Sequence, residues 1–92
     1  MKLLSWNIQW GRGADGVVDL QRTIAAIHTL GDFDVLCLQE VSIGFAGLHG
    51  GQSVDEVAVL AKAFPGYSAH FAAGVDVPDG AGGRSCFGNL TL

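Results

Sequence analysis

The sequence predicts an α/β fold in which strands and helices alternate at first and a β-hairpin follows, in the order β-α-β-α-β-β. Residues 2–8 have the length of a strand and are apolar at Leu3, Leu4, Trp6 and Ile8. Residues 34–39 have the near-continuous hydrophobicity of a strand that is buried on both faces. Between them, Leu20, Ile24 and Ile27 follow the i, i+4, i+7 spacing of one helical stripe. A strand-helix-strand unit pairs its two strands in parallel through a right-handed crossover, so this unit organises the predicted domain.

The composition indicates that the chain is part of a larger domain. Its 92 residues are 49% hydrophobic and only 15% charged. Strands buried on both faces normally need more chain than this, because small domains bury a smaller share of their surface. Residues 87–92 also have the pattern of a strand. We therefore expect residues 1–92 to form the N-terminal portion of one larger domain.

The net charge bears on whether the chain binds nucleic acid, and the cysteines bear on the cellular compartment. The net charge is −4 and the five cations are scattered, so the chain has no basic footprint for extended nucleic acid. Cys37 and Cys86 have no metal-binding spacing and make no disulfide framework, which favours the cytoplasm. No run approaches the roughly 18 apolar residues of a transmembrane helix, so we expect no membrane span.

Local signals place the ends of the first helix. Three glycines predict a loop at 11–16. The helix is expected at 17–30, with Asp15 as its N-cap and Gly31 as the residue after its C-cap. The second strand then occupies 34–39.

The second half of the chain predicts a long loop, a helix and a hairpin. Residues 42–52 contain four glycines, and long ordered loops are often functional. Ser53 and Glu56 have the spacing of a capping box for the next helix, which Pro65 and Gly66 end. The remaining pattern predicts antiparallel strands at 67–73 and 86–92, joined by a turn-rich connection at 74–83.

Polar side chains end the two buried strands. Asn7 lies near the end of the first strand, and Glu40 follows Gln39 at the end of the second. Parallel pairing brings both ends to one edge of the sheet, where ligands bind in open α/β folds. A carboxylate there suits a hard cation such as Mg²⁺. Gln39 should point away from Glu40 by alternation and is predicted to be structural. The alternative is that Glu40 is only the solvated end of a core strand.

The glycine-rich loop supports a different function. Residues 11–16 match G-x-G-x-x-G between a strand and a helix, and Glu40 closes the next strand, which is the context of a dinucleotide-binding (Rossmann-type) module. The bulky residues 6–10 stand where the first glycine should follow the strand closely, and the later hairpin breaks the alternating pattern. A dinucleotide-binding module stays as the alternative.

Three segments resemble one known family. Ser5-Trp6-Asn7-Ile8-Gln9, the run from Asp34 to Val41, and Arg84 to Leu90 are similar to the opening motifs of the endonuclease/exonuclease/phosphatase superfamily, the third to its (Y/F)GN strand. The superfamily has the fold of DNase I and exonuclease III. The resemblance implies that the chain forms the N-terminal part of a DNase I-like four-layer α/β/β/α sandwich.

The resemblance also implies a function. Glu40 matches the glutamate that binds the catalytic Mg²⁺ (or Mn²⁺), and Asn7 matches the asparagine that orients metal and phosphate. The expected activity is metal-dependent phosphoester hydrolysis, as a phosphodiesterase, nuclease or phosphatase. The substrate class stays open among DNA, a lipid headgroup, an inositol phosphate and a nucleotide. The family's water-activating residues have no match here, so we expect the 92-residue chain alone to be inactive.

Other residues enter as secondary candidates. His49, in the loop after Glu40, and Arg84, beside the last strand, are candidate contacts for the substrate phosphate. His28 and His70 are predicted to be structural. A non-enzymatic alternative is a self-associating fragment, a homo-oligomer that pairs through exposed strand edges such as residues 87–92.

Overall fold

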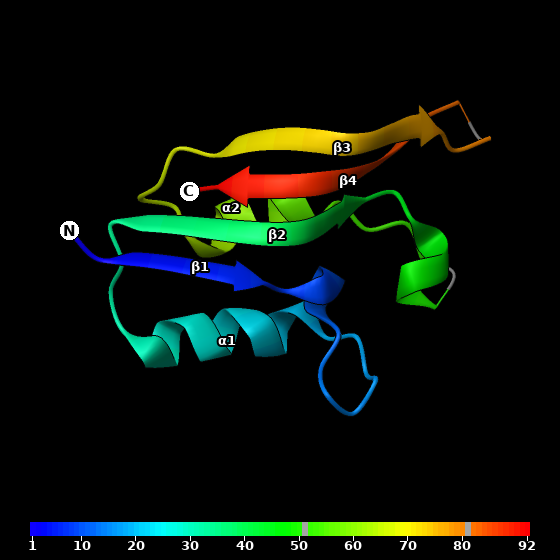
Figure 1. Ribbon diagram of the computed structural model, residues 1–92. Coiled ribbons are helices and arrows are strands. Elements are labelled where there is room, and N and C mark those ends of the chain that lie inside the picture. The colour runs from blue at the N-terminus through cyan, green and yellow to red at the C-terminus, as the bar shows by residue number, and fades with distance from the viewer. Residues whose placement is uncertain (51, 81) are drawn as a thin grey trace.

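The computed structural model describes residues 1–50, 52–80 and 82–92. Over these ranges the chain forms a four-stranded mixed sheet with two α-helices (Figure 1). The elements are β1 (Leu3–Asn7), α1 (Leu20–Leu30), β2 (Val35–Ile43), α2 (Glu56–Ala63), β3 (His70–Pro78) and β4 (Arg84–Thr91), with the short 3-10 helices η1 (Gln9–Gly11) and η2 (Ala46–His49). The predicted α/β class and the order of the elements are confirmed.

The strands lie in the order β1-β2-β4-β3. β1 and β2 are parallel as predicted, with Leu3 opposite Val35 and Asn7 opposite Gln39. β4 is antiparallel to β2 on one side and to β3 on the other. The prediction that residues 87–92 form an exposed edge is therefore wrong, because both neighbours of β4 satisfy its backbone. The edges of the described sheet are β1 and β3.

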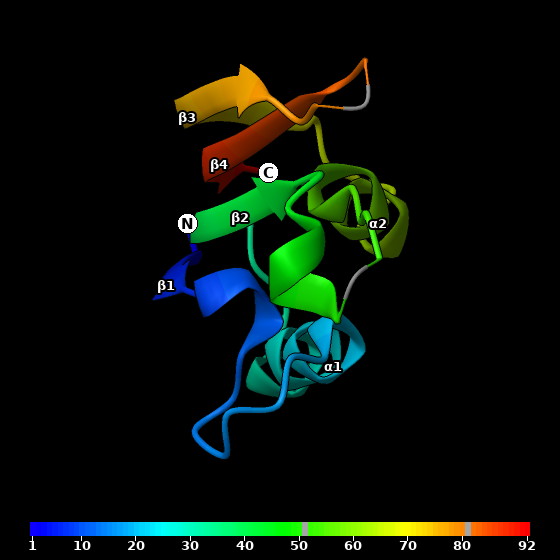
Figure 2. The same cartoon turned by 90° about the vertical axis from the view of Figure 1, so that its right-hand side faces the viewer.

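The two α-helices cover the same face of the sheet. Figure 2 shows α1 and α2 together on one side of the strands, with no α-helix over the opposite face among the described residues. The core lies between this face and the helices, and its most deeply buried large side chains include Ile27, Leu36, Leu38, Leu60 and Leu90. Each such side chain contributes roughly 1.5–3 kcal/mol when it is removed from water. The helices thus pack on one face of the sheet, and no described helix covers the other face.

Helix α1 begins later than predicted. Arg12 and Val18 form an isolated antiparallel bridge that closes a turn at 14–16, so residues 17–19 lie outside the helix. The N-cap is therefore Asp19 and not Asp15, and the Asp19 carboxylate accepts from the backbone N–H of Arg22 at 3.3 Å. Gly31 ends the helix as predicted, at a φ of 125° that favours glycine.

Helix α2 is capped by a residue that the sequence did not single out. Asp55, and not Ser53, is the N-cap, and its side chain accepts from the N–H of Ala58 at 3.0 Å. The predicted capping box is wrong because Glu56 turns inward and is fully buried, where its carboxylate accepts from Ser42 of β2. Glu56 therefore joins the helix to the sheet.

The hairpin also differs in its boundaries. β3 begins at His70 and extends to Pro78, so it starts and ends later than the predicted strand at 67–73. The connection predicted at 74–83 is correspondingly shorter, with β4 beginning at Arg84. Backbone pairing between the strands, from His70 with Thr91 to Pro78 with Arg84, overrides the local glycine and proline signals.

Candidate metal and phosphate site

Glu40 lies at a bulge within β2 and not at the end of the strand. β2 continues to Ile43, and its pairing with β4 shifts register between Leu38 and Val41. Leu38 and Val41 are both fully buried in the core, so two residues, Gln39 and Glu40, occupy the space that one would fill in a regular strand. The predicted strand end is corrected accordingly: only the pairing with β1 ends here.

The backbone of Glu40 is strained. Its φ is 57°, in the left-handed region that glycine normally occupies, including in one common type of bulge. A non-glycine residue in this region costs on the order of 1–3 kcal/mol, and such strain clusters at functional sites. A glutamate at this position therefore has a cost that packing alone does not explain.

The carboxylate of Glu40 is also incompletely satisfied. Its Oε2 atom is buried and has no hydrogen-bond partner among the described residues. Burying a carboxylate oxygen without a partner is costly, whereas a hard cation satisfies such an oxygen. The donor set fits Mg²⁺ or Mn²⁺ in this respect.

Asn7 lies on the neighbouring strand, one residue out of register with Glu40. It is exposed, ends β1 and pairs with Gln39. Its Oδ1 accepts from the N–H of Gln9 at 3.1 Å, which closes a tight turn with positive φ at Gln9 and Trp10. The Nδ2 group has no partner among the described residues, so it is a free neutral donor beside the bulge.

The side chain of Gln39 makes contacts that link β1 to β2. Its Nε2 donates to Ser5 Oγ of β1 at 3.2 Å and to the carbonyl of Cys37 at 3.0 Å. Alternation is interrupted at the bulge, since Leu38 and Val41, three residues apart, are both buried in the core. The side chain of Gln39 ties the two parallel strands together at the point where Asn7 and Glu40 lie.

Sequence reasoning missed Asn89. It is exposed in β4, between Leu90, which pairs with Leu38, and Gly88, which pairs with Val41, so it lies opposite the bulge. The Phe-Gly-Asn motif at 87–89 was the available signal. Strand register thus places positions of β1, β2 and β4 that carry polar side chains next to the bulge.

The two secondary candidates have protein partners. Arg84 pairs with Asp76 across the hairpin, with 2.9 Å between Nε and Oδ1, and this hydrogen bond lowers the pKa of Asp76. His49 is nearly buried, with its Nε2 3.3 Å from Oε2 of Glu56. Neither has a described contact with Glu40.

The other two histidines lie away from the site. His28 is exposed on α1 and stacks on Phe64, with ring centroids 4.9 Å apart. His70 is exposed at the start of β3, where it pairs with Thr91. Neither position has a described contact with Asn7 or Glu40.

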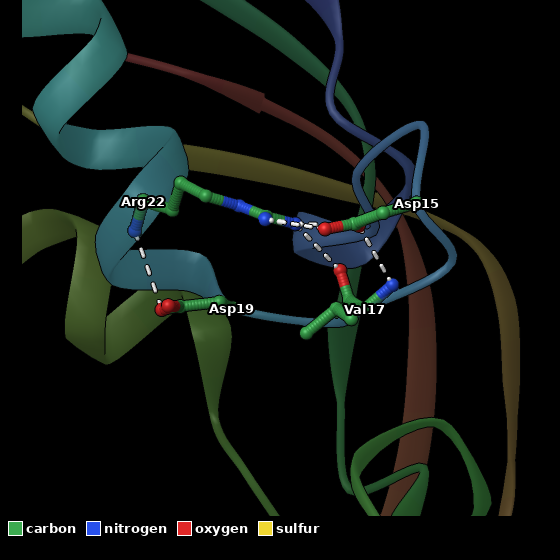
Figure 3. Close-up of polar contacts among 4 residues, drawn as sticks. All are labelled: Asp15, Val17, Asp19 and Arg22. Carbon is green, nitrogen blue, oxygen red and sulfur yellow. Dashed lines mark hydrogen bonds and ion pairs between the residues drawn. The ribbon is translucent and has the colours of Figure 1, made fainter.

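The glycine-rich loop closes on a protein cation (Figure 3). Arg22 binds both carboxylate oxygens of Asp15, at 2.9 and 3.0 Å, and donates to the carbonyl of Val17. The guanidinium lowers the pKa of Asp15 to about 2. A Cβ at Gly13 would overlap this guanidinium, and Asp19 occupies the N-terminus of α1. These contacts explain the loop without a pyrophosphate ligand.

The fold has a counterpart among solved structures. The crystal structure of an endonuclease/exonuclease/phosphatase from Beutenbergia cavernae matches with a TM-score of 0.67 and 28% sequence identity over 98% of this chain. The chain therefore has the fold of one part of an endonuclease/exonuclease/phosphatase domain. The chain spans 25% of the length of that structure. No family model matches the sequence, and no curated protein matches it.

The described residues supply few candidate metal ligands. Over residues 1–50, 52–80 and 82–92, no three His, Cys, Asp or Glu side chains gather where they would hold a metal ion. Mg²⁺ is commonly held by only one or two carboxylates, with water and substrate phosphate completing its shell. Separately, no helix in the described part of the chain is long and apolar enough to cross a membrane.

Proposed function

We propose that this chain carries the metal-binding corner of a Mg²⁺- or Mn²⁺-dependent phosphoester hydrolase. The proposal is carried by Glu40, whose backbone is strained at φ 57° and whose buried Oε2 atom has no partner among the described residues. The similarity to an endonuclease/exonuclease/phosphatase structure supports the same reaction class. The substrate would be a phosphoester of the kind that nucleases, phosphodiesterases or phosphatases hydrolyse.

The proposed roles follow from the chemistry of each side chain. Glu40 would hold the ion, and a bound Mg²⁺ polarises a phosphoryl oxygen. Asn7 would donate its free Nδ2 group to a phosphate oxygen, and as a neutral group it would not repel an anion. Gln39 would keep both strands in register through Ser5. The 92-residue chain would bind the ion without turnover, since no described residue is placed to activate water.

The first test is metal binding by the chain itself. We expect Mn²⁺ to raise the unfolding midpoint of the native chain, because a ligand that binds only the folded state stabilises it by about 2.7 kcal/mol at a hundred times its Kd. Glu40→Gln, which keeps the shape and removes the charge, should abolish the shift. Calorimetric titration with Mn²⁺ and Mg²⁺ gives the affinities.

Asp32→Asn is the matched control. Asp32 is an exposed carboxylate in the segment before the N-terminal end of β2, away from the bulge at Glu40. Its loss should leave the Mn²⁺ shift intact. Equal Mn²⁺ binding by the native chain and Glu40→Gln would refute the assigned ligand.

A further inference from the structure

A second polar cluster lies buried where β2, η2 and α2 meet. The carboxylate of Glu56 accepts from the N–H and the hydroxyl of Ser42, at 2.8 and 2.9 Å, both through Oε1. Its other oxygen, Oε2, lies 3.3 Å from Nε2 of His49. The side chains of Glu56 and His49 are 0% and 10% exposed. This cluster has no described contact with Asn7 or Glu40.

The contact between His49 and Glu56 depends on protons. Neither Nε2 nor Oε2 has a hydrogen bond of good geometry with any described residue, although the two atoms face each other. Desolvation raises the pKa of Glu56, against the opposing effects of Ser42 and His49. A buried carboxylate is stable only when it is paired or protonated. One proton, on either side chain, makes the pair favourable.

Other titratable groups nearby do not replace this proton. Asp55, the neighbour of Glu56 on α2, is exposed and caps the helix. Cys86 of β4 faces Asp76, and its pKa is raised by desolvation. Among the described residues, His49 is the one ionisable side chain within ion-pair distance of Glu56.

The segment that His49 anchors is otherwise fixed mainly at its base. Ser85 donates to the carbonyl of Gly44, and the N–H of Gly44 donates to the carbonyl of Val54. Beyond that base, Phe45 meets Phe87 edge to face. The described backbone bonds of η2 are local ones, such as Leu48 N–H to the Phe45 carbonyl. Among the described residues, His49 therefore makes the polar link between η2 and α2.

We propose that the His49–Glu56 contact is a latch for residues 46–49, closed by a single proton held between the two side chains and opened when that proton is lost. Losing it leaves the negative charge of the buried carboxylate uncompensated, because a neutral imidazole can donate an N–H to Oε2 but carries no positive charge. The segment then moves away so that water reaches Glu56. The sign agrees with the raised pKa of Glu56. A raised pKa contributes stability that is present at low pH and is lost as the pH rises.

Amide exchange of the 92-residue chain tests the latch. Exchange rates for residues 46–49, corrected for the intrinsic pH dependence of amides, should be flat in mild acid. Above the pH at which the pair loses its proton they should rise by about tenfold per pH unit, the slope for one proton. Amides in β2 and α1 serve as internal references and should show no such rise.

Two variants separate the latch from simple packing. Glu56→Gln keeps an oxygen for Ser42 and offers an amide donor to neutral His49, so the segment should stay closed with no pH-dependent rise. His70→Gln removes an exposed histidine on β3 and should leave the rise unchanged. The latch is wrong if the native chain shows no rise between about pH 5 and about pH 9, the range over which histidine changes charge. It is equally wrong if Glu56→Gln keeps the native rise.

Discussion

At the scale of single residues, Glu40 combines two unfavourable features. Its backbone is left-handed, and its Oε2 atom is buried without a partner. Natural sequences tolerate such costs where a function needs the side chain. The same position would be easy for glycine, which loses nothing at positive φ. Stability and the proposed metal binding therefore make opposite demands on residue 40.

Replacing this residue tests the trade-off. We expect Glu40→Gly to raise the free energy of unfolding by about 1 kcal/mol, because the relief of left-handed strain exceeds the added entropy of the unfolded glycine. Urea denaturation measures the change. The variant should also lose the shift with Mn²⁺. Gln39→Gly is the matched control and should lower stability, since Gln39 has no positive φ and loses its bond to Ser5. A Glu40→Gly variant that is less stable than the native chain would contradict the inference that strain at Glu40 lowers stability.

At the scale of elements, the β3–β4 hairpin depends on a close approach of its strands. Gly88 in β4 pairs with Ala73 of β3, next to a register shift between Ala73 and Val75. A Cβ at Gly88 would overlap the carbonyl oxygen of Ala72 and crowd the Cα of Ala73. The glycine of the Phe-Gly-Asn motif is therefore required for strand pairing, beside the bulge that holds Glu40.

Gly88→Ala should accordingly destabilise the fold. Overpacking against backbone costs typically 1–3 kcal/mol, so we expect a loss of about 2 kcal/mol in the free energy of unfolding. Gly66→Ala is the control, since a Cβ at Gly66 meets nothing within 4 Å and its φ is not positive. Thermal and urea unfolding of both variants give the comparison. Equal stability of the two variants would mean that β3 yields to the extra methyl group.

At the scale of the whole molecule, the sheet is covered by helices on one face and leaves an edge at β3. Val75 and Val77 of this edge strand are exposed, at 43% and 42%. Exposed apolar edge strands invite pairing with another chain. Asp76 and Pro78, together with the register shift beside Ala73, are the kinds of feature that reduce such pairing.

We expect the isolated 92-residue chain to self-associate reversibly through β3 at high concentration. Val75→Lys, which places a charge on this edge, should shift the association to several-fold higher concentration in sedimentation or light scattering. Val17→Lys is the control, because Val17 is also exposed but lies in the loop before α1. A native chain that stays monomeric at millimolar concentration would contradict association through this edge.

The sequence by itself determined the order of the elements and the parallel pairing of the first two strands. Apolar periodicity is local, and a strand-helix-strand unit has essentially one handedness, so Asn7 and Glu40 had to approach the same part of the sheet. The Gln-Glu and Phe-Gly-Asn motifs pointed to the same fold that the structural comparison supports. The position of the core stripe on α1 was likewise readable, since Leu20, Ile24 and Ile27 are all buried.

Only the tertiary structure decided how these parts meet. The insertion of β4 between β2 and β3 depends on pairing between segments far apart in the chain, which no local pattern records. The same pairing creates the bulge that makes Glu40 left-handed, a conformation that nothing in a glutamate predicts. The packing of α2 and η2 against β2 also turns Glu56 from an expected helix cap into a buried partner of Ser42 and His49. The type of each residue limits the interactions that it can make. Burial and strand register decide which of those interactions form.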